Sequence, residues 1–172
     1  MNTTEQPVAI VTGASSGIGL GITRSLLERG WRVLGTSRTI SKSKDLKPST
    51  HLVLVDGDVS KKETAVQVVE AAIKHFGRID LLVNNAGIFI PKPFTEYTED
   101  EYNQVMNTNV ASMFFMTQQV IPRMKQQKSG HFINVSSVAG HKVGPGFAVY
   151  AATKFAVRAL SEGLRQIGRA HV

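Results

Sequence analysis

Short apolar runs rich in β-branched residues alternate along the chain with longer segments in which apolar residues recur every three or four positions. The first pattern predicts buried strands, and the second predicts amphipathic helices. Strands are expected at Val8–Thr12, Trp31–Ser37, His51–Asp56, Ile79–Asn84 and His131–Ser136, and helices at Gly17–Arg29, from about Lys61 to Phe76, within Glu99–Lys125 and from about Tyr150. This order is typical of an α/β fold with a parallel sheet covered by helices on both faces.

Local signals at the expected helix ends agree with this order. Ser60 and Thr98 each stand three residues before a Glu, the spacing at which a hydroxyl and a carboxylate together satisfy free amides at a helix start. Gly30 and Gly77 each follow a helical run, where glycine can adopt the left-handed conformation that ends a helix. The sequence has no internal repeat and no interdomain linker, so residues 1–172 are expected to form a single domain.

The composition limits the classes of protein that remain. With 42% apolar and 19% charged residues, it is that of an ordinary globular domain. No apolar run has the length of a membrane span and no signal peptide is visible, which favours a cytoplasmic protein without membrane contact. There is no Cys, and the five His lack metal-ligand spacing, so no disulfide and no metal site are expected. The net charge of +7 raises nucleic acid as a partner, but the basic residues are dispersed, and no nucleic-acid surface is expected.

A glycine-rich loop, Thr12-Gly13-Ala14-Ser15-Ser16-Gly17-Ile18-Gly19, joins the first expected strand to the first helix. Glycines in such a loop allow a tight turn and close approach of the backbone to a phosphate, and the helix N-terminus offers free amides to an anion. The place of the loop between a strand and a helix favours a dinucleotide pyrophosphate site. A strand-to-helix turn that needs only small residues is the alternative.

Tyr150 and Lys154 are four residues apart at the start of the last expected helix, so their side chains share one face. A nearby ammonium favours the phenolate form of a tyrosine and suits it to acid–base chemistry. Ser137 lies thirteen residues before the Tyr, at the end of an apolar run. Taken alone, the Tyr–Lys spacing is more often that of a surface pair without chemistry.

Four motifs, in this order, resemble the short-chain dehydrogenase/reductase family over residues 7 to about 165. They are Thr-Gly-x-x-x-Gly-x-Gly at residues 12–19, Asn84-Asn85-Ala86-Gly87 after the fourth strand, a Ser after the fifth, and Tyr-x-x-x-Lys at the next helix. The resemblance implies a Rossmann-type, doubly wound parallel sheet in a three-layer αβα arrangement. It also implies hydride transfer between a nicotinamide dinucleotide and a small-molecule carbonyl or alcohol.

The resemblance further implies roles for particular residues. Tyr150 would be the general acid or base, Lys154 would hold the nicotinamide ribose, and Ser137 would hydrogen-bond the substrate oxygen. Asn109 would hold a water that relays protons to Lys154; a helix-distorting Asn with a purely local hydrogen bond is the alternative. Substrate contacts are expected from Ser137 and Tyr150, and cofactor contacts from Gly13, Ser15, Ser16, Gly17, Ile18, Gly19, Arg38, Asp58, Val59, Asn85, Ala86, Gly87, Tyr150 and Lys154.

The residue after the second strand selects between NADP(H) and NAD(H). An acidic side chain there would bind the ribose hydroxyls and repel a 2′-phosphate, whereas a basic one can pair with that phosphate. Ser37-Arg38 has a positively charged side chain and no carboxylate, and Lys42 and Lys44 follow. This favours NADP(H). Position 16 is Ser, where the family often has a second basic residue, so the preference depends mainly on Arg38. A solvated loop Arg is the alternative.

Two further assignments have alternatives of similar weight. Asp58-Val59 resembles the family pair that holds the adenine, and an Asp that merely precedes a helix near Ser60 is the alternative. The apolar run Met113–Met116 suggests a homodimer or homotetramer of the full-length protein, unless these residues face their own sheet.

The end of the chain is expected to be an interruption. The complete fold of the family has two more strands, so the sheet edge after the fifth strand would stay unpaired and the chain would be poorly soluble. Residues from about 167 to 172 are the translation of the DNA sequence ATC GGA AGA GCA CAC GTC, which is part of a common sequencing adapter. We therefore expect this tail not to be native. A nicotinamide-binding regulator or an inactive fragment is the alternative to an enzyme, and the complete Asn, Ser, Tyr and Lys set favours the enzyme.

Overall fold

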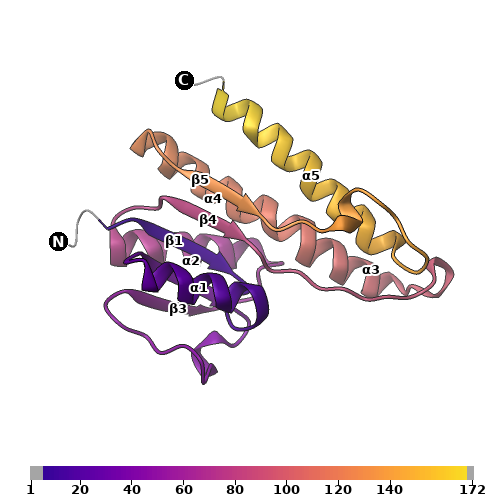
Figure 1. The fold of residues 1–172 in the computed structure, drawn as a ribbon, viewed down its shortest axis with the longest axis horizontal. Coiled ribbons are helices and arrows are strands. Elements are labelled where there is room, and N and C mark those ends of the chain that lie inside the picture. Colours follow the sequence, from indigo (N-terminus) through magenta and orange to yellow (C-terminus); the bar gives the residue numbers. More distant parts are fainter. Residues whose placement is uncertain (1–5, 170–172) are drawn as a thin grey trace.

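Five parallel strands in the order β3-β2-β1-β4-β5 form the central sheet (Figure 1). The computed structural model describes residues 6–169. The strands are β1 (Val8–Thr12), β2 (Arg32–Ser37), β3 (Leu52–Asp56), β4 (Leu81–Asn84) and β5 (His131–Asn134). The strand order reverses at β1, and in open α/β sheets such a reversal creates a crevice at the carboxyl ends of the strands.

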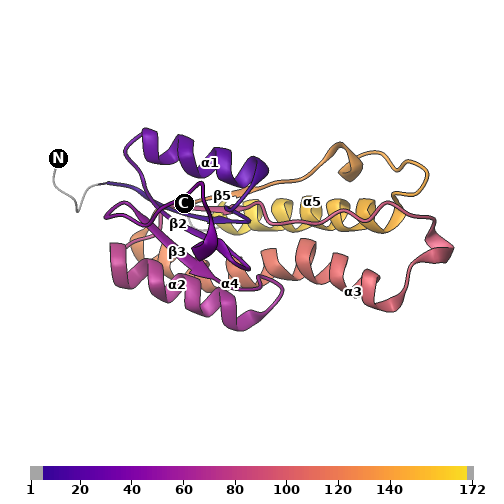
Figure 2. The ribbon, with the colours of Figure 1, turned by 90° about the horizontal axis from the view of Figure 1, so that it is seen from below.

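Helices cover both faces of this sheet. They are α1 (Gly17–Glu28), α2 (Lys62–Phe76), α3 (Glu99–Met106), α4 (Ser112–Gln127) and α5 (Ala148–Arg169), with 3-10 turns η1 (Ile40–Lys42), η2 (Phe94–Glu96) and η4 (Val138–Gly140) and a π-helical turn η3 (Asn107–Ala111). Helix α1 lies on one face, and α2 and α4 lie on the other (Figure 2). Helix α5 runs beside β5, where Asn134 Nδ2 donates to Ser161 Oγ at 2.9 Å. The expected three-layer αβα arrangement is confirmed.

Two apolar cores hold the helices on the sheet. In β1, Val8 and Ile10 point into the core beneath α2 and α4, while Ala9 and Val11 point into the core beneath α1. All four side chains are fully buried. Strands buried on both faces have continuous apolar sequences, which is why these runs predicted a parallel sheet.

Four strands are shorter than the sequence predicted: β2 and β3 each begin one residue later, and β4 and β5 each lose two residues. Ile79 is fully buried, but a side chain takes its backbone hydrogen bonds: its amide donates to Gln127 Oε1 at 3.0 Å, and Gln127 Nε2 donates to its carbonyl at 2.8 Å. β4 therefore begins at Leu81. β5 ends at Asn134 rather than Ser136. For β4, the apolar run marks burial, and burial at Ile79 begins before the first residue of the strand.

One of the two expected capping boxes forms. Thr98 Oγ1 accepts from the Glu101 amide at 3.2 Å, and the Glu101 carboxylate accepts from the Thr98 amide at 3.0 Å. The prediction of a capping box at Ser60 is wrong. The Ser60 amide donates to the Asp58 carboxylate at 2.9 Å, and the N-cap of α2 has no side-chain hydrogen bond. Both glycines that were expected to end helices have a φ of 79°, in the left-handed region.

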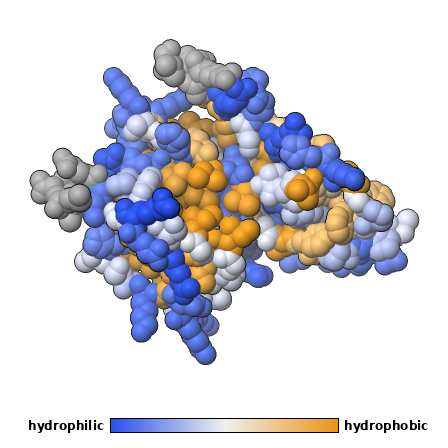
Figure 3. All heavy atoms as spheres, viewed as in Figure 1, coloured by the Kyte–Doolittle hydropathy of each residue, from blue (hydrophilic) through white to orange (hydrophobic). Residues whose placement is uncertain are grey.

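The fifth strand is uncovered on the face that carries α1. Ile133 pairs with Val83 and so points to that face, where 49% of Ile133 is exposed. Figure 3 shows apolar residues open to solvent in the middle of this face. On the opposite face, Phe132 packs against the core beneath α2 and α4. Among residues 6–169, β5 pairs only with β4, so its outer edge is open.

The apolar run on α4 divides between core and surface. Met113 and Met116 are buried, and Phe115 packs against the core beneath α2 and α4. Phe114 is 50% exposed. Met116 and Phe115 therefore face their own sheet, which was the alternative interpretation for half of this run, and Met113 is buried but belongs to neither core.

The described residues bear on the expectations about membrane spans, metal sites and the non-native tail. No helix within residues 6–169 is both long and apolar enough to cross a membrane. In the same residues, no three His, Asp or Glu side chains gather closely enough to hold a metal ion. Of the expected non-native tail at residues 167–172, the last three residues lie outside the described part of the chain.

Candidate active site

The glycine loop lies at the carboxyl end of β1, and its glycines meet different constraints. Gly13 and Gly17 have φ values of 66° and 53°, a region that disfavours a Cβ. A Cβ on Gly19 would lie 2.2 Å from the Gly13 carbonyl oxygen, so α1 can pack this closely only without a side chain there. The N-cap Ser16 makes no side-chain capping hydrogen bond, which leaves the first amides of α1 open to an anion.

The turn after β4 is fastened to this loop. Thr12 Oγ1 accepts from the amides of Asn85 and Ala86, both at 3.0 Å. Asn85 Nδ2 donates to the carbonyl oxygens of Thr12 and Gly13, at 2.9 and 3.3 Å. A Cβ on Gly13 would lie only 3.0 Å from Ala86 Cα. Two segments more than seventy residues apart therefore form one continuous surface.

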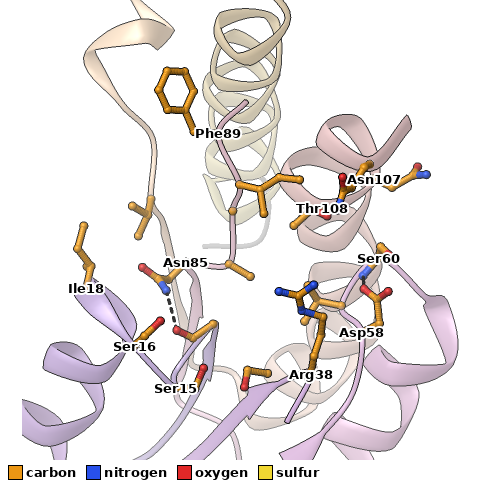
Figure 4. A pocket seen from close by; sticks show the side chains of 18 of the residues that line it. Ser15, Ser16, Ile18, Arg38, Asp58, Ser60, Asn85, Phe89, Asn107 and Thr108 are labelled. Atoms are coloured by element: carbon orange, nitrogen blue, oxygen red, sulfur yellow. Dashed lines mark hydrogen bonds between the residues drawn. The ribbon is translucent and has the colours of Figure 1, made fainter. Parts of the chain in front are cut away.

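A cleft of about 700 Å³ opens beside this surface, at the carboxyl ends of the strands (Figure 4). Most of the expected site residues line it: Gly13, Ser15, Ser16, Ile18, Arg38, Asp58, Val59, Asn85, Ala86, Gly87, Tyr150 and Lys154. Four expected residues are not among its lining residues, namely Gly17, Gly19, Asn109 and Ser137. The two glycines act on the shape of the loop rather than on the cleft wall.

Tyr150 and Lys154 project from the first turns of α5 into the cleft. Lys154 Nζ lies 5.6 Å from the centroid of the Tyr150 ring and donates to the Val135 carbonyl at 3.0 Å. Lys154 is only 5% exposed, and this burial lowers the pKa of its ammonium. A Cβ on Gly87 would lie 3.7 Å from Lys154 Nζ, so the turn after β4 passes close over the ammonium.

Asn109 lies in the π-helical turn η3 and is almost fully buried. Its Oδ1 accepts from the Ile88 amide at 2.8 Å, and its Nδ2 donates to the Ile88 carbonyl at 2.9 Å and to Thr153 Oγ1 at 3.1 Å. The helix is distorted here, as the alternative interpretation of Asn109 expected, but these hydrogen bonds are not local. Asn109 ties the turn after β4 to helix α5.

The cleft contains Ser136 rather than Ser137. Ser136 Oγ donates to the Lys154 carbonyl at 3.4 Å. Ser137 Oγ accepts from the Ala139 amide at 3.2 Å, at the start of η4. The role of Ser137 stays a prediction, and of the two serines it is Ser136 that lines the cleft.

Arg38 and Asp58 lie near each other at the opposite end of the cleft, beyond β2 and β3 (Figure 4). Burial raises the pKa of Asp58, but the hydrogen bonds from Ser60 and the charges of Lys61 and Arg38 outweigh burial and hold this pKa below its ordinary value. The bond from Ser60 is the helix-preceding arrangement that was the alternative for Asp58. Asp58 also faces the cleft, so the two interpretations are compatible.

Comparison with known proteins places the chain in a family. The sequence model for short chain dehydrogenases matches residues 7–171. The chain belongs to the short-chain dehydrogenase family. An uncharacterised oxidoreductase of Staphylococcus saprophyticus is 44% identical over 170 residues, which cover 96% of this chain and 69% of that protein. One from Listeria monocytogenes is 39% identical over 168 residues, covering 95% and 68%.

Solved structures agree with this assignment. A short-chain dehydrogenase from Streptomyces avermitilis matches with a TM-score of 0.92 and 34% identity, over 97% of this chain and 62% of that one. A tyrosine-to-phenylalanine variant of ElxO with NADPH bound matches with a TM-score of 0.87 and 26% identity, over 96% and 69%. This short-chain dehydrogenase sequence thus has the Rossmann-type fold and spans between 62% and 69% of the length of these relatives.

Some lining residues of this short-chain dehydrogenase were not foreseen from the sequence. Besides Ser136, they are Ser37, Thr39, Gly57, Ser60, Lys61, Ile88, Phe89, Gln104, Asn107, Thr108 and Val135. Most stand at the end of a strand or within five residues after it, a position that could have indicated them. The side chains from α3 and η3 had no such signal, because only the folded chain brings that helix to the cleft.

The cleft fits a dinucleotide. Positions 13 and 19 form a cradle that a Cβ would fill, beside a helix N-terminus without a side-chain cap. That combination suits a pyrophosphate, which needs close backbone and free amides. Basic side chains stand at both ends of the cleft, Arg38 at one and Lys154 at the other. The residues present therefore match the shape and charge of the group that the family implies.

Proposed function

We propose that this protein transfers a hydride between NADP(H) and a small-molecule carbonyl or alcohol, with Tyr150 as the general acid or base. The observation that carries this proposal is that Tyr150 and Lys154 share one cleft with the glycine loop. An acid–base pair placed beside a dinucleotide cradle is the arrangement that this reaction needs.

Each step follows from the properties of these side chains. The nicotinamide dinucleotide, when bound, supplies or accepts the hydride. The buried ammonium of Lys154 binds ribose hydroxyls and lies 5.6 Å from the centre of the Tyr150 ring. Tyr150 donates its proton to the substrate oxygen during reduction and takes it back during oxidation. A serine hydroxyl, from Ser137 as the sequence predicts or from Ser136 beside it, stabilises the charge that develops on that oxygen.

Asn109 completes the proposed proton path. A Cβ built on Gly87 would lie 3.4 Å from Asn109 Oδ1 and 3.7 Å from Lys154 Nζ, so both side chains lie close beneath the same turn. The π-helical turn also interrupts the regular pattern of helical hydrogen bonds at Asn109. We assign to Asn109 the water that connects Lys154 to solvent.

The preference for NADP(H) is supported by Arg38. Its guanidinium is exposed on the cleft wall where β2 ends, and Lys61 stands on the wall nearby. A 2′-phosphate at this end can form a charge-assisted bond with Arg38. ElxO, in its NADPH-bound structure, is a relative with this fold that binds the same cofactor.

A homodimer or homotetramer of the full-length protein also belongs to this proposal. Apolar side chains are exposed on both long helices: Phe114 on α4 is 50% exposed, and Phe155 on α5 is 42% exposed. Exposed apolar residues on neighbouring helices are typical of contact surfaces between subunits.

The test removes one hydroxyl. Tyr150→Phe is expected to lower kcat for carbonyl reduction by about 10²–10⁴-fold, the usual contribution of general acid catalysis, and to leave the Kd for NADPH nearly unchanged. Tyr102→Phe is the matched control, because Tyr102 is on α3, is 46% exposed and does not line the cleft. A Tyr150→Phe protein with near-normal kcat would contradict the proposal, and NADPH binding without turnover of any carbonyl would favour a regulator.

A further inference from the structure

We infer that Phe89 and Phe147 form the specificity-determining wall of the substrate site, which selects neutral carbonyls or alcohols borne on an aryl or similarly flat apolar group. The inference rests on the proposed hydride transfer at Tyr150 and specifies the substrate class of that reaction. It names a role for residues that the sequence motifs left unassigned.

The two rings surround the proposed proton donor. Phe89, in the turn after β4, lies with its ring centroid 4.7 Å from that of Tyr150, at an angle of 60°. The ring of Phe147, just before α5, meets Phe89 edge-on at 5.0 Å and 85°. A substrate oxygen bonded to the Tyr150 hydroxyl would carry its substituent past these rings. Aromatic faces and edges contact flat apolar groups favourably at these separations.

This wall is open to an incoming molecule. Phe89 is 46% exposed and Phe147 is 39% exposed, although aromatic side chains of this size are usually more buried. Ile18, which also lines the cleft from the start of α1, is 66% exposed. Two of these apolar side chains, Phe89 and Ile18, line the cleft, and Phe147 is outside the lining and backs Phe89 edge-on, so the wall presents apolar area that a ligand can cover.

Charge divides the cleft into two ends. Arg38 and Asp58 stand at the end formed by β2 and β3, away from Phe89 (Figure 4). Lys61 also lines the cleft, and its charge acts on Asp58. Among the described lining residues, Lys154 is the one charged group near the aromatic end, and its Nζ is turned to the Val135 carbonyl. None of these lining cations is placed to pair with a carboxylate or phosphate on the substrate, so the site favours a neutral molecule.

The wall is also held in place before any ligand arrives. The Lys92 amide donates to the Gly146 carbonyl at 3.2 Å, which joins the segment of Phe89 to that of Phe147. Lys92 Nζ contacts both carboxylate oxygens of Glu101, at 3.0 and 2.9 Å, and so fastens the same segment to α3. A preformed wall costs less ordering free energy on binding than a mobile one.

Two methyl ketones separate the ligand classes. Acetophenone and pyruvate both carry a methyl ketone, and they differ in having a phenyl group or a carboxylate. We expect the wild-type chain with NADPH to have a higher kcat/KM for acetophenone than for pyruvate. Phe89→Ala should lower kcat/KM for acetophenone by about tenfold and that for acetone by less than about twofold, because only the phenyl group reaches the ring.

The matched control is Phe94→Ala. Phe94 is on the same segment, is 73% exposed and does not line the cleft. Its replacement should therefore leave kcat/KM unchanged for both acetophenone and acetone. A wild-type preference for pyruvate, or an equal effect of Phe89→Ala on acetophenone and acetone, would overturn the inference.

A binding measurement separates this inference from the proposed reaction. If no ketone is reduced, the proposed function fails, and saturation-transfer NMR of acetophenone with the NADPH-loaded chain decides the inference. Transfer to the phenyl protons in the wild type that is lost in Phe89→Ala supports the aromatic wall. Absence of transfer in the wild type, or its survival in Phe89→Ala, refutes the wall.

Discussion

Replacing Gly19 by alanine tests whether the closest contact in the glycine loop is as tight as the structure describes. The added Cβ would lie 2.2 Å from the Gly13 carbonyl oxygen and 2.5 Å from Asn85 Nδ2, whereas ordinary contacts begin at 3.4 Å. Either α1 or the loop must move by about 1 Å, and such overpacking costs about 1–3 kcal/mol. Displacing Asn85 also weakens two hydrogen bonds, at about 1 kcal/mol each.

The expected loss of stability is therefore about 3–5 kcal/mol, which corresponds to a fall in Tm of roughly 6–20 °C for a domain of this size. Gly21→Ala is the control on the same helix. Gly21 is exposed, nothing lies within 4 Å of the place that an added methyl group would occupy, and alanine there should stabilise the helix by about 0.5–1 kcal/mol. Thermal unfolding followed by far-UV circular dichroism measures both. Equal Tm values for Gly19→Ala and the wild type would refute the reasoning.

Three further predictions concern charge and exposure. Arg38→Asp should replace a preference for NADPH in kcat/KM by one for NADH, because it removes an attraction for the 2′-phosphate and adds a repulsion; equal use of both cofactors by the wild type would contradict this. Burial lowers the pKa of Lys154 below 10.5, so between the folded-state pKa and 10.5 the unfolded chain binds more protons and stability rises with pH. Urea unfolding of the wild type and Lys154→Met at several pH values should show this rise only in the wild type. Ile133→Lys places a charge on the open edge strand and should increase the soluble fraction, measured by centrifugation, with little change in Tm.

The sheet and the glycine loop could be predicted because their causes are local. Strands buried on both faces need unbroken apolar runs, and a tight turn into a helix needs glycine, so Val8–Thr12 and Gly13 are visible in the sequence itself. The boundaries were less certain. Ile79 is apolar because it is buried, but a side chain from α4 takes its backbone hydrogen bonds.

The contacts that complete the site could not be predicted, because they join distant segments. The Thr12 hydroxyl accepts a hydrogen bond from a turn 73 residues away, and no periodic pattern in the sequence predicts a contact over that separation. The meeting of Phe89 with Phe147 depends likewise on two loops that only the fold brings together. Ser136 and Ser137 are adjacent, and the spacing to Tyr150 favoured Ser137, yet Ser136 is the serine that lines the cleft, with its hydroxyl donating to the Lys154 carbonyl.

The π-helical turn η3 has a consequence for the phase of the helix that contains it. Each residue of an α-helix advances by about 100°, so one extra residue in a single turn rotates everything before it, relative to everything after it, by about that angle. Gln104 and Thr108 can therefore face the cleft while Met113 and Met116 are buried, along one nearly continuous helix. Deleting Ala111 alone would restore the regular repeat and turn one of these two faces away from its partner. In this segment the number of residues matters as much as their identity.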